Sequence, residues 1–152
     1  MKAKDLMSLD VITVRIDATA GECADIMREY LISCLPVINF DGKLVGILTS
    51  SDFGLTRRTM PRGEVFYTVL NSSANADTVE KLTEELRATA IRDVMAQPVI
   101  TVKETTPVGV VVMTMMERRV NHIPVVKEDG EVVGIITRHD LLKMLAKEAV
   151  AT

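Results

Sequence analysis

This chain carries an internal repeat that spans most of its length. Residues 4–14 (KDLMSLDVITV) align with residues 92–102 (RDVMAQPVITV) at an offset of 88 (92 − 4), and the register holds without a gap through Asp52 and Asp140. Identical residues recur at this offset along the aligned stretch: Gly21 and Gly109, Met27 and Met115, Pro36 and Pro124, Gly42 and Gly130, Gly46 and Gly134, Thr49 and Thr137. Such a repeat predicts two copies of one supersecondary unit, which ordinarily pack against each other.

Each copy is expected to run strand, helix, strand, tight turn, strand, helix, which gives a mixed α+β fold with two helices and a small three-stranded sheet per unit. In the first copy, apolar residues recur at the i, i+3, i+4, i+7 spacing of one helix face. In the second copy, the β-branched run 110–112 could form a strand, but its alignment and Pro107 at the helix start predict a helix. The predicted helices are 18–30 and 106–118, with shorter ones after Thr49 and Thr137, and the predicted strands are 11–14, 35–39, 44–48, 99–102, 123–127 and 132–136.

Asp41-Gly42 and Asp129-Gly130, each flanked by apolar alternation, predict hairpin turns of the two-residue type. The first repeat is expected at 1–53 and the second at 92–148, together forming one module. Between them, residues 54–91 predict a connector with an irregular Pro- and Gly-containing segment followed by a helix, with Asp77 or Thr78 as its N-cap.

Composition narrows the function classes. The net charge of −3 and the pI near 5.4 give no basic surface of the kind that binds phosphodiester backbones, so no nucleic-acid partner is expected. No segment reaches about 18 unbroken apolar residues, and two aspartates interrupt the N-terminal apolar stretch, so we expect a soluble cytoplasmic protein without a membrane partner. Cys23 and Cys34 lack metal-ligand spacing and are expected to stay reduced.

The motif Thr-x-x-Asp closes each repeat, at Thr49–Asp52 in GILTSSD and at Thr137–Asp140 in GIITRHD. One interpretation is a capping box, in which the threonine and the acid only start a helix. The other is a binding site, and the two are compatible, because a cap fixes the carboxylate that a ligand would need.

The repeat as a whole resembles a tandem pair of CBS domains, often called a Bateman module. The resemblance rests on five motifs in fixed order in both copies: (R/K)-D-(L/V)-M, V-I-T-V, x-h-P-V, D-G and V-G-I-h-T-x-x-D. It implies two small sheets that face each other across a pseudo-two-fold axis, and two clefts for adenosine-containing ligands such as AMP, ADP, ATP or S-adenosylmethionine. It also implies a homodimer and an unidentified regulated protein.

The resemblance assigns two ligand sets. The aspartates would bind ribose hydroxyls, the threonines would lie at helix starts that favour phosphate, and Gly46 and Gly134 would leave room beside the ligand. Apolar residues and prolines would form the adenine slot, although the apolar side chains could equally be core, and the polar residues before the buried strands discriminate better. The first set is Ile12, Ile32, Ser33, Pro36, Thr49 and Asp52, and the second is Ile100, Val120, Asn121, Pro124, Thr137, Arg138, His139 and Asp140.

The two sets differ in charge. Arg138 and His139 lie within the second Thr-x-x-Asp motif, where the first has two serines, so the second site is expected to prefer phosphorylated ligands. The alternative is that both are solvated surface residues. His122 aligns with Cys34, which favours a structural role for the histidine.

Three function classes follow. The first is a ligand-sensing regulatory module without a catalytic cofactor, whose possible regulatory ligand is an adenine nucleotide or S-adenosylmethionine. The second is a dimerisation or interaction module that needs no ligand. The third, an enzyme, is not expected, because the sequence has no nucleophile with a placed base, no metal cluster and no Walker-type loop.

Overall fold

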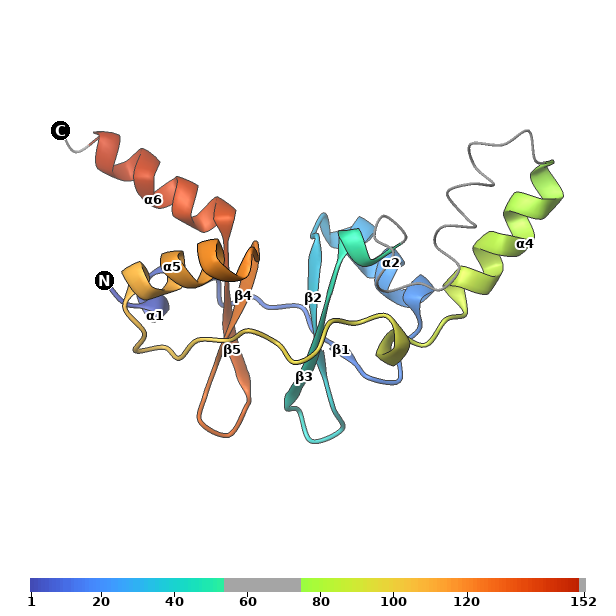
Figure 1. Cartoon of the computed structure of the whole chain (residues 1–152), viewed down its shortest axis with the longest axis horizontal. Coiled ribbons are helices and arrows are strands. Elements are labelled where there is room, and N and C mark those ends of the chain that lie inside the picture. The colour runs from blue at the N-terminus through green and yellow to red at the C-terminus, as the bar shows by residue number, and fades with distance from the viewer. Residues whose placement is uncertain (54–74, 151–152) are drawn as a thin grey trace. The chain divides into compact units, whose positions relative to one another are not determined.

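The computed structural model describes residues 1–53 and 75–150, with side chains described as far as residue 146. The chain divides into two compact units, each with one small sheet and helices (Figure 1). The N unit comprises Thr13–Asp41 and Val45–Val99, and the C unit comprises Met1–Ile12, Gly42–Leu44 and Ile100–Thr152. The mixed fold class with two small sheets is confirmed. The boundaries of the compact units differ from those of the sequence repeats.

The N unit is built on a three-stranded sheet in the order β1-β2-β3, in which β1 and β2 run parallel with Val14 opposite Val37. Helix α4 packs on helix α2. The elements are β1 (Val14–Arg15), α2 (Ala20–Tyr30), β2 (Cys34–Ile38), β3 (Leu44–Thr49), the 3-10 turn η1 (Ser50–Asp52), α4 (Ala76–Arg87) and the 3-10 turn η2 (Ile91–Asp93).

The C unit is built on an antiparallel pair of strands, and helices α1, α5 and α6 pack around this pair (Figure 1). The elements are α1 (Ala3–Leu6), α5 (Val108–Arg118), β4 (His122–Val126), β5 (Val132–Thr137) and α6 (Arg138–Val150). Helix α6, with 13 residues, is longer than the 11 residues of α5, so the prediction of a short helix after Thr137 was wrong.

The predicted third strand of the C unit, 99–102, is reduced to a single parallel bridge between Val102 and Val125. Val102 donates to Pro124 O at 3.2 Å, and Val126 donates back to Val102 O at 3.0 Å. The N unit continues its ladder two residues after Val14, where the Ile16 N–H donates to Ile38 O at 2.9 Å. In the C unit the chain turns away after Val102, and the Lys103 N–H donates to Thr106 Oγ1 at 3.0 Å. The expectation of three strands is therefore confirmed in the N unit and wrong in the C unit.

Helices α2 and α5 confirm the predictions at 18–30 and 106–118, but each begins two residues later than predicted. Thr19 and Pro107 take the extended N-cap conformation, and Thr19 Oγ1 accepts from Glu22 N at 3.3 Å. Both helices end in the same way, with Leu31 and Arg119 in the left-handed region at φ 53° and 54°.

The hairpin turns and the connector helix also differ from the predictions. Lys127 N–H donates to Glu131 O at 2.9 Å, and Gly130 N–H donates to Lys127 O at 3.1 Å, so the second hairpin has a three-residue loop. In each Asp-Gly pair, the glycine has positive φ and the aspartate does not. A two-residue type I′ turn needs positive φ at both of its central residues. The N-cap of helix α4 is Asn75, whose Oδ1 accepts from Thr78 N at 3.0 Å, so the prediction of Asp77 or Thr78 as N-cap was wrong. The irregular segment predicted before the helix lies outside the described residues.

The leading segment of each repeat packs in the unit formed mainly by the other repeat. In the C unit, Ser8 pairs with Ile135 of β5 through two backbone hydrogen bonds, of 2.9 and 3.0 Å. In the N unit, Ala96 pairs with Ile47 of β3 in the same way, at 2.9 and 3.1 Å. These pairs occupy equivalent positions of the repeat, since each differs by 88 residues (96 − 8 and 135 − 47).

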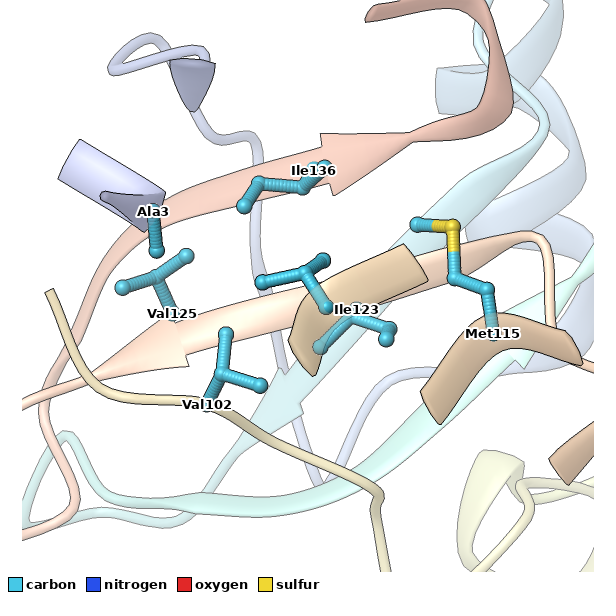
Figure 2. Close-up of a cluster of buried hydrophobic side chains, with 7 residues drawn as sticks. Ala3, Val102, Met115, Ile123, Val125 and Ile136 are labelled. Carbon is cyan, nitrogen blue, oxygen red and sulfur yellow. The ribbon is translucent and has the colours of Figure 1, made fainter. Parts of the chain in front are cut away.

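The core of the C unit is a cluster of apolar side chains drawn from five segments of the chain (Figure 2). Six of its members converge in Figure 2 from α1, the 100–107 segment, α5, β4 and β5. The cluster comprises Ala3, Val102, Val111, Met115, Ile123, Val125 and Ile136. Burial of these side chains stabilises the C unit by about 25 cal/mol per Å² of apolar area removed from water. No helix within the described part of the chain is long and apolar enough to span a bilayer.

Candidate functional site

The second Thr-x-x-Asp motif lies where β5 ends and α6 begins. Asp140 Oδ2 accepts from Thr137 N at 2.8 Å and from Thr137 Oγ1 at 2.9 Å, and Asp140 N–H donates to Thr137 Oγ1 at 3.4 Å. Asp140 is only 7% exposed, and among the described residues it is the one charged residue that is buried. The threonine and aspartate therefore cap α6 in the way that the capping interpretation predicts.

The first motif makes the same two hydrogen bonds from threonine to the aspartate carboxylate, but a shorter helix follows it. Asp52 Oδ2 accepts from Thr49 N at 2.7 Å and from Thr49 Oγ1 at 3.2 Å. The helix that follows is only the three-residue 3-10 turn η1, and Asp52 is half-buried. The two motifs thus share the carboxylate geometry but differ in the length of the helix behind it.

Each of the two aspartate carboxylates is held through one oxygen, Oδ2. All the hydrogen bonds of the Asp52 and Asp140 carboxylates to described residues go to Oδ2. Within the described residues, no buried side-chain nitrogen or oxygen lacks a hydrogen-bond partner, so Oδ1 is not sealed in the interior. A carboxylate oxygen held in this way can accept a further hydrogen bond from a hydroxyl group.

The polar residues before strands β2 and β4 fix the helix starts through their main chain. Ser33 O accepts from Ser50 N at 3.0 Å, and Asn121 O accepts from Arg138 N at 3.1 Å. Their side chains are exposed. The structure therefore brings Ser33 together with Thr49 and Asp52, and Asn121 together with Thr137 and Asp140, as the resemblance implied.

The predicted apolar residues divide by burial and by unit. Ile12, Ile32, Ile100 and Val120 are half-buried. Pro36 and Pro124 are less than 2% exposed, so their rings present almost no surface to a ligand. All of the second set lies in the C unit, whereas Ile12 belongs to the C unit and the rest of the first set to the N unit. No single unit therefore contains the whole first set.

The space beside Gly46 and Gly134 is filled by methionines of the leading segments, which the sequence reasoning missed. A Cβ atom on Gly134 would lie 2.7 Å from Met7 Cγ, and one on Gly46 would lie 2.8 Å from Met95 Cγ. The expectation that these glycines leave room for a ligand was therefore wrong. The signal was the Met at the end of each (R/K)-D-(L/V)-M motif, which recurs at the same offset as the glycines.

Burial shifts the pKa values of both cysteines and of His122. Burial first, and the nearby Asp52 charge second, raise the pKa of Cys34 to about 12, and burial and Glu22 raise the pKa of Cys23 to about 11. Both thiols are thus protonated at neutral pH. Burial lowers the pKa of His122 from 6.5. Among the described residues, no group of three or more His, Cys, Asp or Glu could hold a metal ion, and Arg138 and His139 are exposed.

Comparison with known proteins agrees with the repeat and the fold. The CBS domain family profile matches residues 3–53 and 91–147. The chain is 32% identical over 142 residues to inosine-5'-monophosphate dehydrogenase of Methanocaldococcus jannaschii, covering 93% of this chain but only 23% of that enzyme.

Two solved structures have a similar fold. The CBS domain of a CBS domain-containing membrane protein from Sphaerobacter thermophilus is 38% identical with a TM-score of 0.75, over 94% of this chain and 86% of the other. The CBS domain pair of protein MJ0100, solved in complex with 5'-methylthioadenosine and S-adenosyl-L-methionine, is 28% identical with a TM-score of 0.72, over 97% and 98%. The chain belongs to the CBS domain family, with two CBS domains in tandem.

Proposed function

We propose that this chain is a regulatory module that senses an adenosine-containing ligand and signals to a separate partner protein. The ligand is an adenine nucleotide (AMP, ADP or ATP) or a compound of the S-adenosylmethionine type. The observation that carries the proposal is the pair of Thr-x-x-Asp motifs, in which the hydrogen bonds to described residues hold Oδ2 of each carboxylate and leave Oδ1 for a ligand. The MJ0100 domain pair, which was solved with two adenosyl compounds, supports the ligand class.

In the second repeat, the Asp140 carboxylate would accept hydrogen bonds from the ribose 2′ and 3′ hydroxyls. Thr137, Arg138 and His139 lie at the start of a 13-residue helix, where the dipole favours an anion. The Arg138 N–H donates to Asn121 and the Asp140 N–H to Thr137, so within the described residues the His139 N–H remains for a phosphate oxygen. The slot for adenine would be formed by Ile100, Val120 and Asn121, with Pro124 supporting its strand.

In the first repeat, Asp52 and Thr49 would take the same roles toward a second ligand, with Ile32 and Ser33 beside the adenine and Pro36 in the supporting strand. The three-residue η1 turn offers a weaker anion site than α6, and serines replace Arg138 and His139. We therefore assign phosphorylated ligands to the second repeat and uncharged or cationic adenosyl ligands to the first.

Calorimetric titration of wild type and Arg138→Ala with adenosine and AMP tests the assignment. Arg138→Ala should weaken AMP binding about 10- to 100-fold, because a charge-assisted hydrogen bond is lost, and should leave adenosine affinity nearly unchanged. Ser50→Ala, at the equivalent position of the first repeat, is the matched control and should leave AMP binding at the second site intact. Equal losses for adenosine and AMP would remove the phosphate role of Arg138.

Absence of binding to the wild type, in calorimetry and in a thermal-shift screen, would instead favour a ligand-independent interaction module. In either role we expect no catalytic step. The homodimer that the family resemblance implies, and a regulated partner protein, are part of the same proposal.

A further inference from the structure

His122 begins strand β4 directly opposite Thr137, the last residue of β5 and the first of the second Thr-x-x-Asp motif. The Arg138 N–H donates to Asn121 O at 3.1 Å, so the adjacent pair, His122 with Thr137, is a non-hydrogen-bonded pair of the antiparallel ladder. Side chains approach each other most closely in such pairs. The imidazole is therefore a cross-strand neighbour of the threonine that binds Asp140.

His122 and Thr137 lie on the face of the strand pair that points away from the C-unit core. The residues next to them in the strands, Ile123 and Ile136, are fully buried in that core (Figure 2). Successive residues of a strand point to opposite faces. His122, which is half-buried, thus shares its face with the motif proposed to bind a ligand and not with the apolar cluster.

The first repeat carries Cys34 at the position equivalent to His122, 88 residues earlier. Burial, and after it the charge of Asp52, raise the pKa of Cys34 to about 12, so this position is close enough to feel the motif aspartate. A thiol with this pKa stays neutral at any pH near 7. Histidine differs, because its charge changes close to neutral pH. Burial lowers the pKa of His122 from 6.5, so the imidazole is neutral at pH 7 in the chain without ligand.

The charged groups in the elements around His122 are mostly cations. Helix α6 packs on β5 and α5 packs on β4. On the other side of β4, Lys103 lies at the far end of the strand, where its Nζ donates to Lys127 O at 2.8 Å. A phosphate group at the start of α6 would supply the negative charge that an imidazolium needs there. The charged and titratable residues that adjoin His122 are Arg118 and Arg119 at the end of α5, and Arg138, His139 and Asp140 at the start of α6.

We propose that His122 couples the binding of a phosphorylated ligand at the second repeat to the uptake of a proton from solvent, so that this site responds to its ligand and to pH together. The inference rests on the function proposed above for the second repeat. A bound phosphate favours the imidazolium, and the imidazolium strengthens phosphate binding, because such linkage is reciprocal. Adenosine has no phosphate and should take up no proton. Cys34 gives the first repeat no such response.

Calorimetric titration with AMP in two buffers of different ionisation enthalpy measures the proton uptake. The Asp52→Ala variant serves as the background, because it confines binding to the second repeat. At about pH 7.5 this chain should take up a fraction of a proton for each AMP bound. Its affinity for AMP should rise as the pH falls from about 8 to about 6.5, by at most about tenfold per pH unit for one proton. Adenosine should show neither effect.

His122→Cys copies the first repeat and should abolish both the proton uptake and the pH dependence. His122→Gln repeats the test with another neutral side chain, and circular dichroism verifies that each variant is folded. The chain has two histidines, so His139→Ser, which copies Ser51, is the matched control and should retain the proton uptake whatever its effect on affinity. The second ionisation of the AMP phosphate, near pH 6, is common to all the variants.

The outcomes separate this inference from the function on which it rests. Proton uptake that survives His122→Cys and His122→Gln, or that disappears in His139→Ser, would overturn the role of His122. AMP binding without proton uptake would overturn the coupling and leave the ligand site in place. A chain that binds neither AMP nor adenosine would overturn the proposed function itself.

Discussion

Asp140 combines two tasks at the residue scale. Its Oδ2 closes the cap of α6 through Thr137, and its Oδ1 is the oxygen proposed to meet a ribose. Both roles need the same position of the side chain, so the cap preorganises the ligand contact. Because the Asp140 carboxylate is nearly buried, it loses little side-chain entropy when a ligand binds.

Asp140→Ala should abolish binding of both AMP and adenosine at the second site, because the ribose contact is common to both ligands. The lost cap should lower the free energy of unfolding by about 0.5 to 2 kcal/mol. Urea unfolding and calorimetry measure the two effects separately. Asp52→Ala, the equivalent change in the first repeat, serves as the control for the second site and should leave AMP binding there unaffected.

His122 should make stability dependent on pH. Its pKa is lowered in the folded chain because burial disfavours the charged form, so the unfolded chain binds the proton more readily. Stability is therefore complete above the unfolded value of 6.5 and falls as pH drops below it. His122→Cys, which copies the first repeat, should flatten the slope of unfolding free energy between pH 7 and pH 5, by at most about 1.4 kcal/mol per pH unit. An unchanged slope would contradict this origin.

Much of the candidate site could be predicted from the sequence at this scale, because two aligned copies place Ser33, Asn121 and the Thr-x-x-Asp residues by local hydrogen bonds. The methionines over Gly46 and Gly134 could not be predicted. Their partners lie far away in sequence, and a Gly in a strand has several physical explanations that only the packing distinguishes.

At the element scale, α2 and α5 show how one helix pattern serves two surroundings. Their lengths, their left-handed ends and their buried sides agree, because these depend on residues within the repeat. Their outward sides differ, because α4 covers α2. The helices were predictable from spacing, whereas the strand pattern at 99–102 does not show where the chain leaves the sheet, which happens after Val102.

Gly21 and Gly109 should respond oppositely to alanine. Gly21→Ala should destabilise the chain, because the new Cβ would lie 2.9 Å from Arg87 Cβ, an atom fixed by the α4 backbone. Gly109→Ala has open space and should stabilise α5 by up to about 1 kcal/mol through helix propensity. Thermal unfolding of the two variants checks the pair. Similar changes of the unfolding temperature in the two variants would contradict the close packing of α4 on α2.

At the scale of the whole molecule, the compact units do not coincide with the sequence repeats, because the leading segment of each repeat belongs to the unit formed mainly by the other repeat. Each compact unit depends on residues that precede the other repeat, through the Ser8–Ile135 and Ala96–Ile47 pairs and the methionines beside them. A substitution in the leading segment of one repeat should therefore destabilise the sheet formed by the other repeat.

Met95→Ala tests this dependence. Met95 is 7% exposed, so its truncation should cost about 2 to 5 kcal/mol. Hydrogen exchange should accelerate in β2 and β3, although Met95 belongs to the second repeat in sequence. Met7→Ala should act reciprocally on β4 and β5, with a smaller effect because Met7 is only half-buried. Faster exchange confined to the repeat that carries the substitution would contradict the exchange of segments.

The exchanged segments also bear on the ancestry of the chain. A half-chain of one repeat would leave the edge of its last strand without the pairing that residues such as Ser8 or Ala96 supply, and two identical half-chains could supply it to each other by swapping their leading segments. Joining two such genes in tandem preserves every one of these contacts, since each segment only changes from intermolecular to intramolecular. A tandem duplication would link two such partners covalently, and the exchange of leading segments would need no new residue. Later divergence could then give the two halves different surfaces.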